Sequence, residues 1–125
     1  MTKQKFANQW LRHFAPELSK ADFQKYVKDQ HIWHVFSWKL IPLDNLLTGD
    51  AARQAFNAVN KADCLCCDAF GSEGVTDILS PHYDTAEKID AAMTEFYIVD
   101  KDYTWTYIKT HECDFCGPYF FKKDT

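Results

Sequence analysis

The stretch from Glu95 to Phe121 reads EFYIVDKDYTWTYIKTHECDFCGPYFF, and it carries most of the information on the fold. Residues 95–100 and 104–111 are rich in aromatic and β-branched side chains, which favour strands. The polar run 100–103 between them is typical of a tight turn, so we expect an antiparallel hairpin. A His-Glu-Cys-Asp-Phe-Cys-Gly-Pro cluster follows, and the aromatic run 119–121 predicts one more strand.

Upstream of this stretch, helix and strand patterns alternate. Apolar residues at i, i+4, i+5 and i+8 from Phe6 predict a first helix, which Pro16 ends. Further helices are expected after the capping residues Ser19 and Thr48 and within 84–93, and strands at 31–38 and 64–70. The consecutive strands near the end indicate an α+β fold, with a mostly antiparallel sheet of four or five strands and three or four helices packed mainly on one face. We expect residues 1–125 to form a single domain.

The composition points to a packed core and a reducing compartment. The chain has 46% apolar residues and contains four Trp, six Tyr and ten Phe, which bring large buried areas. We expect Trp33, Phe36, Trp105 and Phe120 to be buried. The N-terminus lacks the apolar run of a signal peptide, and no apolar run approaches the ~18 residues of a membrane span. Five cysteines without an export signal indicate reduced thiols, so a cytoplasmic location without membrane binding is expected.

Charge is distributed unevenly along the chain. Residues 1–30 carry six basic and three acidic side chains, whereas residues 63–114 carry twelve acidic side chains and three lysines. An acidic surface repels phosphate backbones, which argues against nucleic acid as a partner. The acidic half is either ordinary solvated surface or a surface that meets a protein partner with a basic surface.

Three segments resemble a family of small bacterial proteins known only as a domain of unknown function. They are WHVFSW at 33–38, YIVDKDYTWTY at 97–107, and Thr110-His-Glu with Cys116-Gly-Pro-Tyr-Phe120. The resemblance implies a single-domain cytosolic protein without an assigned activity. In that family position 116 is usually Cys, position 115 is commonly Trp, and position 113 is often not Cys. The last point weakens any mechanism that needs Cys113.

The segment His111–Gly117 contains one C-x-x-C-G knuckle of the kind that presents two thiolates to zinc. Cys113 and Cys116 would supply two ligands of a zinc site, and Cys64, Cys66, Cys67 or His111 could complete it if the strand 64–70 lies near. The set that we name is Cys64, Cys66, Cys113 and Cys116. The competing interpretation is that the thiols are small buried groups that fill a sheet. One knuckle is half of a motif, so we expect no cofactor, with zinc as the alternative.

The candidate functional corner consists of His111, Glu112 and Cys116, which could serve as base, orienting group and thiolate nucleophile, with Asp114 as the alternative orienting group. On a strand, His111 and Glu112 would point to opposite faces, so they could not both meet Cys116 without a bulge. A redox role for the two cysteines lacks the helix N-terminus that lowers a thiol pKa. We therefore expect a structural hinge at Gly117-Pro118, with Cys116 as a small buried group, His111 held by hydrogen bonds, and no catalytic residues.

Function is the least determined property of this sequence. Trp38 and Tyr107 are possible interface aromatics, although such residues more often belong to a sheet core. Our hypothesis is a small binding or interaction module without catalysis, whose most concrete form is an immunity- or inhibitor-like partner protein. The alternative is a zinc-binding or thiol-dependent protein centred on His111, Cys113 and Cys116.

Overall fold

The computed structural model describes residues 1–72, 74–112 and 115–123. Its helical elements are α1 (Lys3–Phe14), α2 (Lys20–Asp22), the π-helical turn η1 (Phe23–Val27), α3 (His34–Ser37), α4 (Gly49–Ala58), the 3₁₀ turn η2 (Pro81–Tyr83) and α5 (Ala86–Ala92). Its strands are β1 (Leu46–Thr48), β2 (Cys64–Asp68), β3 (Val75–Thr76), β4 (Phe96–Asp100), β5 (Trp105–Lys109) and β6 (Tyr119–Lys122). No helix in the described ranges is long and apolar enough to cross a bilayer.

The six strands form one antiparallel sheet in the order β1-β6-β5-β4-β2-β3. At its centre lies the expected hairpin of β4 and β5, whose turn is stabilised by Asp100. The Asp100 carboxylate accepts hydrogen bonds from the backbone N–H groups of Thr104 and Trp105, at 2.6 and 3.0 Å. The predicted α+β class is confirmed, with six strands in the described part of the chain rather than four or five.

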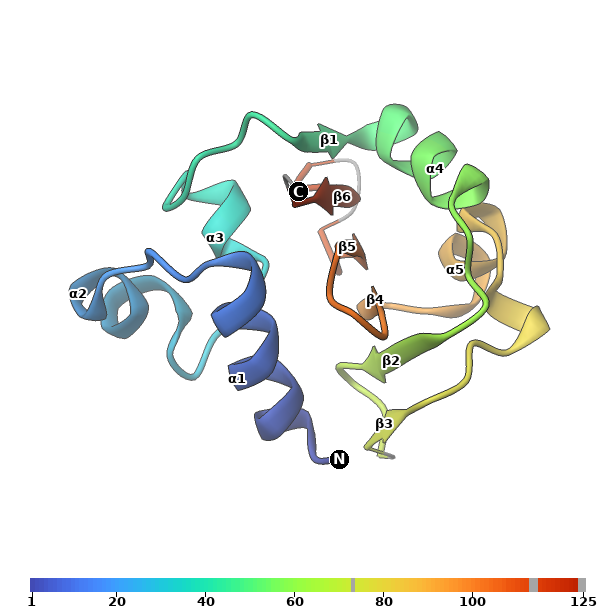
Figure 1. Cartoon of the computed structure of the whole chain (residues 1–125), viewed down its shortest axis with the longest axis horizontal. Helices are drawn as coiled ribbons and strands as arrows, with labels where there is room; N and C mark the ends of the chain where they lie inside the picture. Colours follow the sequence, from blue (N-terminus) through green and yellow to red (C-terminus); the bar gives the residue numbers. More distant parts are fainter. Residues whose placement is uncertain (73, 113–114, 124–125) are drawn as a thin grey trace.

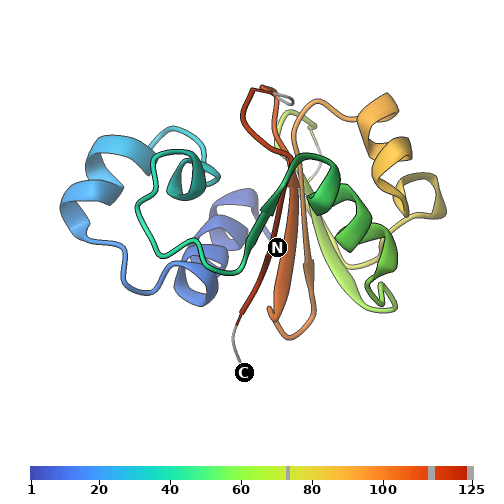
Figure 2. The ribbon, with the colours of Figure 1, turned by 90° about the horizontal axis from the view of Figure 1, so that it is seen from above.

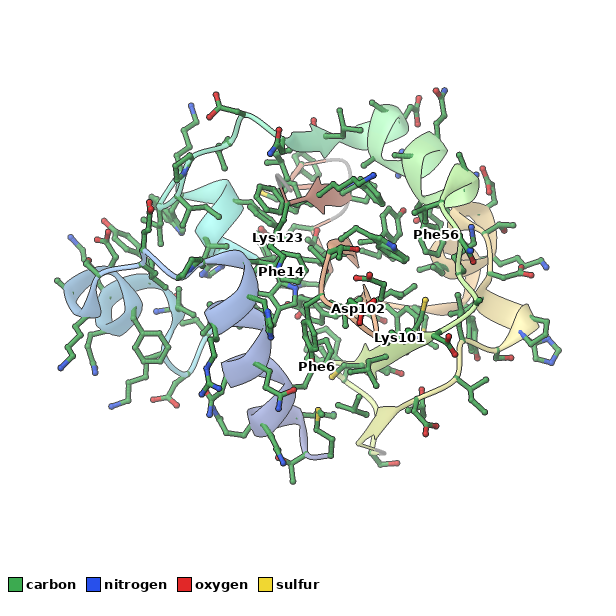
Figure 3. All side chains as sticks on the ribbon, viewed as in Figure 1. Phe6, Phe14, Phe56, Lys101, Asp102 and Lys123 are labelled. Atoms are coloured by element: carbon green, nitrogen blue, oxygen red, sulfur yellow. The ribbon has the colours of Figure 1, made fainter. Side chains whose placement is uncertain are left out.

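Helices cover both faces of the sheet, not mainly one as expected (Figures 1 and 2). The helices α1 and α3 pack on one face, and α4 and α5 pack on the other. Figure 3 labels Phe6 and Phe14 on the α1 side and Phe56 on the α4 side. Strand side chains alternate between the two cores, since Tyr97 of β4 joins the α1 core and Phe96 joins the α4 core. Both faces of the sheet are therefore buried under apolar side chains, many of them aromatic.

The strand predicted at 31–38 is wrong, because this segment contains the helical turn α3. Trp33 and Phe36, three residues apart, are both buried, whereas Trp38 is exposed. That spacing puts two large rings on one face of a single helical turn, where they cover the sheet. The segment is rich in residues that favour strands, but packing against β6 and α1 decides its conformation.

Most other predicted elements are present. Ser19 caps α2 by accepting a hydrogen bond from the backbone N–H of Asp22 at 3.1 Å, as the capping pattern predicts. Thr48 precedes α4 as expected, although its side chain makes no capping bond. The short edge strands β1 and β3 were not predicted, since two or three residues carry little periodicity. The four expected core aromatics, Trp33, Phe36, Trp105 and Phe120, are all buried.

Candidate functional site

One end of the sheet brings together polar side chains that are far apart in the sequence. Glu95 directly precedes β4, and His111 follows β5 by two residues, so the β4–β5 pairing places them side by side. The segment that leads into α3 crosses the same end and adds His31 and Trp33. Tyr97, the second residue of β4, completes the group, which we call the Glu95 cluster.

Glu95 is the centre of this cluster. Its side chain is 1% exposed, and its two carboxylate oxygens make four hydrogen bonds. Oε1 accepts from the indole N–H of Trp33 at 2.9 Å and bonds Nδ1 of His111 at 2.8 Å. Oε2 accepts from the hydroxyl of Tyr97 at 2.9 Å and bonds Nδ1 of His31 at 3.1 Å.

These bonds keep the buried carboxylate ionised. Burial would raise the pKa of Glu95, but the hydrogen bonds from His111, Trp33 and Tyr97 outweigh it and hold that pKa below its usual value. An ionised carboxylate has no hydrogen to donate, so Nδ1 of both histidines carries the hydrogen of its bond. In the neutral rings, Nε2 then holds a lone pair. Glu95 thus sets the tautomer of both rings.

The two histidine rings lie against each other and reach the surface. Their centroids are 4.6 Å apart, and their side chains are 30% (His31) and 31% (His111) exposed. Phe70, itself 58% exposed, meets both rings edge-on, with centroids at 6.5 and 5.9 Å. Beside His31 lies a pocket of about 270 Å³, whose lining includes Glu95, Tyr97, Phe70 and Lys3. The cluster is therefore buried at the carboxylate and accessible at the imidazoles.

The Glu95 cluster contains three groups that could hold a metal ion. Ligand atoms of His31, Glu95 and His111 all lie within 4.8 Å of one another. Two imidazole nitrogens with one carboxylate form a donor set found in zinc and non-haem iron sites. No other such group occurs among the residues that the structure describes.

The predicted corner of His111, Glu112 and Cys116 is only partly brought together. His111 turns to Glu95, while Glu112 is exposed and its backbone carbonyl accepts the N–H of Cys116 at 2.7 Å. Cys116 is half-buried against the α1 core, and burial and the nearby Glu112 raise the pKa of its thiol. The sulfur is therefore a thiol at neutral pH and not a ready nucleophile.

The expected hinge is present at Gly117-Pro118. Gly117 has φ +93°, a conformation that favours glycine, and the chain turns there into β6. The side chain of Thr110 hydrogen-bonds the carbonyl of Cys116 and closes the bend. His111 is held by hydrogen bonding as predicted, although its partner is a carboxylate and not a loop.

The cysteines proposed for zinc do not converge. Cys64 and Cys66 lie in the α4 core, on the opposite face of the sheet from Cys116. Cys116 precedes β6, which is three strand spacings of about 4.8 Å from β2. Burial raises the pKa of Cys64 to about 11 and that of Cys66 to about 12, so both are protonated thiols. Cys113 and the alternative orienting residue Asp114 lie outside the described residues.

The two proposed interface aromatics differ in exposure. Tyr107 is fully buried and stacks on Phe56, with centroids 4.4 Å apart, so it offers no accessible surface. Trp38 is 57% exposed and packs against Tyr26 at 5.0 Å. Only Trp38 is placed where a partner could touch it.

Sequence reasoning named His111 but missed the rest of the Glu95 cluster. Glu95 was assigned to the start of a strand and His31 to the start of another, with no role for either. The one available signal was a carboxylate directly before the apolar run FYIV, since a carboxylate that is buried together with such a strand needs hydrogen-bond partners. His31 lies 64 residues from Glu95, and nothing in the spacing relates them.

Comparison with known proteins identifies the family. No curated protein and no solved structure matches the chain. A family model described as "Domain of unknown function (DUF4275)" matches residues 2–120, nearly the whole sequence. The resemblance to a family of unknown function is thereby confirmed. The chain belongs to the DUF4275 family.

Proposed function

We propose that this protein binds a divalent transition-metal ion at the Glu95 cluster, through His31, His111 and Glu95. The observation that supports it most is the pair of contacts between the buried carboxylate and the Nδ1 atoms of the two histidines, at 2.8 and 3.1 Å. This replaces the four-cysteine zinc hypothesis, whose described members lie on opposite faces of the sheet.

The spacing of these atoms suits ligation. Two ligands about 2.0–2.2 Å from a tetrahedral ion lie roughly 3.3–3.5 Å apart. The observed nitrogen–oxygen distances of 2.8 and 3.1 Å are slightly shorter. An ion therefore needs small shifts of the two rings. It would also replace the Nδ1 hydrogens of the two histidines, which now lie in these contacts. The side chains of both rings are partly exposed, at 30% and 31%.

Trp33 and Tyr97 would support the ligating carboxylate. Both donate to Glu95 at 2.9 Å, and neither needs to move when an ion replaces the histidine hydrogen bonds. Ligating carboxylates are usually held by such outer partners, whose loss typically lowers metal affinity 10–100-fold. Three protein ligands leave at least one coordination position open, as in catalytic rather than structural zinc sites.

Isothermal titration of untagged, chelator-treated protein with zinc tests the proposal. We expect one site with a Kd of about 1 μM or tighter, weakened at least about tenfold in His31→Ala and His111→Ala. Tyr97→Phe should bind more weakly while keeping the ring packing, and His82→Ala, which alters an exposed histidine elsewhere, should bind normally. Equal affinity in all four variants would show that zinc binds elsewhere, and absence of binding would leave the Glu95 cluster as a structural network.

A second candidate function is the interaction module expected from the sequence. It is favoured by Phe115, which is 95% exposed and close in sequence to His111, and by exposed Phe70 and Trp38. Large exposed aromatics contribute strongly to protein interfaces. The exposed acidic residues Asp63, Asp77, Glu87 and Glu112 suit a partner with a basic surface. A partner isolated from the host should bind less well at high salt and should lose affinity for Phe115→Ala. A partner indifferent to both changes would contradict this candidate.

A further inference from the structure

The tautomer set by Glu95 has a consequence for what the site can bind. In the hydrogen-bonded cluster each histidine donates from Nδ1, which leaves a lone pair on Nε2 of a neutral ring. Nδ1 of each ring faces the buried carboxylate, and the two side chains are 30% and 31% exposed. In the neutral rings the Nε2 edge is thus a hydrogen-bond acceptor, beside a carboxylate with charge −1.

Metal binding at Nδ1 would reverse the hydrogen-bonding role of each histidine ring. For the ion to bind Nδ1, the proton on Nδ1 must leave to solvent. A ring that stays a neutral imidazole then takes up a proton at Nε2. Each ring keeps one proton, and its Nε2 edge changes from acceptor to donor. The charge of the three side chains with a divalent ion becomes +1, compared with −1 before. The open coordination position adds a place for an oxygen ligand.

The adjoining pocket has the features of a site for a small organic anion. It measures about 270 Å³ and is lined by His31, the ammonium-bearing Lys3 and apolar side chains that include Phe6, Ile32 and Phe70. Lys3 is held there by a hydrogen bond from Nζ to the carbonyl of Ala69 at 3.2 Å and a second one to the carbonyl of Gly71. The negative charge of Glu95 would repel an anion in this pocket. The positive charge of a bound metal ion would outweigh that repulsion.

We propose that the metal-loaded protein binds a small carboxylate in the pocket beside His31, and that the metal-free protein does not. The inference rests on the proposed metal site and adds the chemical class of the ligand. Loading supplies an open coordination position, Nε2–H donors and a positive charge together, and the apolar wall accepts the body of the acid.

Benzoate titrated into zinc-loaded and metal-free protein tests this, with benzylamine as the cationic probe of similar shape. We expect benzoate to bind the loaded protein at least about tenfold more tightly than the metal-free protein. Benzylamine should not share this preference. Phe70→Ala, saturated with zinc, should bind benzoate severalfold more weakly than the zinc-saturated parent protein. Phe115→Ala, which alters a more exposed ring outside the pocket lining, should bind benzoate normally.

Nitrogen NMR of labelled histidines supplies the second measurement. We expect His31 and His111 to carry the proton on Nδ1 without zinc and on Nε2 with zinc. Equal benzoate affinity in both forms would overturn the inference and leave the metal site standing. Zinc binding with Nδ1–H retained on both histidines would contradict the proposed ligand atoms, and would overturn the proposed function as well as the inference. Failure of zinc to bind would overturn the proposed function and the inference together.

Discussion

Replacement of Glu95 by glutamine is the most informative perturbation of the fold. Glu95→Gln preserves size and removes the charge that four donors share. A hydrogen bond to a charged acceptor contributes ~1.5–3 kcal/mol and one to a neutral acceptor ~0.5–1.5 kcal/mol. Each bond should thus lose about 1–1.5 kcal/mol. Only the bonds from Trp33 and Tyr97 come from buried side chains, so we count these two bonds. We expect Glu95→Gln to lower the free energy of unfolding by about 2–3 kcal/mol.

Urea unfolding of chelator-treated protein measures this loss, and Glu17→Gln is the matched control. Glu17 is exposed, so its substitution should change the free energy of unfolding by less than about 0.5 kcal/mol. The pH dependence provides a second check. Because the folded state lowers the pKa of Glu95, its contribution is present above the ordinary value of about 4.3 and is lost as the pH falls through the folded pKa. This acid-dependent loss should be smaller in Glu95→Gln. A variant as stable as the control would refute the assignment of Glu95 as the buried anion.

Three further substitutions or treatments test the packing. Trp105→Ala should lower the free energy of unfolding by ~3–5 kcal/mol, because the ring is buried and stacks on Phe120, and a loss under ~1 kcal/mol would contradict this. Gly117→Ala should cost ~1–3 kcal/mol, since its φ is +93° and a Cβ would lie 3.2–3.3 Å from neighbouring side chains. Gly49→Ala, with positive φ and open space, should cost less. Burial raises the pKa of the Cys66 thiol to about 12, so this thiol should resist iodoacetamide at pH 8.5 until the protein unfolds. The free energy of unfolding should fall as the pH rises from about 8.5 toward 12. Rapid labelling of the folded protein would show an exposed thiol.

The fold could be predicted where local pattern and tertiary packing agree. The β4–β5 hairpin follows from two strand-like runs around a polar turn, and Ser19 caps α2 as its spacing predicts. The segment 31–38 could not be assigned in this way. Its aromatic and β-branched residues favour a strand, yet Trp33 and Phe36 cover the sheet from one helical turn. Short apolar runs do not distinguish these two outcomes.

The site was less accessible to sequence reasoning than the fold. The C-x-x-C motif drew attention to His111, and the histidine does belong to the Glu95 cluster. The proposed thiol partners failed because alternate residues of β2 point to one face, which carries Cys64 and Cys66 away from Cys116. Glu95 and His31 meet His111 only through strand pairing and the path of the chain into α3. Such contacts leave no spacing pattern in one sequence.

The central claim is that His31, His111 and Glu95 hold a metal ion, and a crystal structure of protein grown with zinc tests it most directly. The account predicts an anomalous-scattering peak about 2.0–2.2 Å from Nδ1 of both histidines and from a carboxylate oxygen of Glu95. Trp33 and Tyr97 should still donate to that carboxylate. A structure at saturating zinc with no ion there, and with the two histidine contacts kept at 2.8 and 3.1 Å, would contradict it.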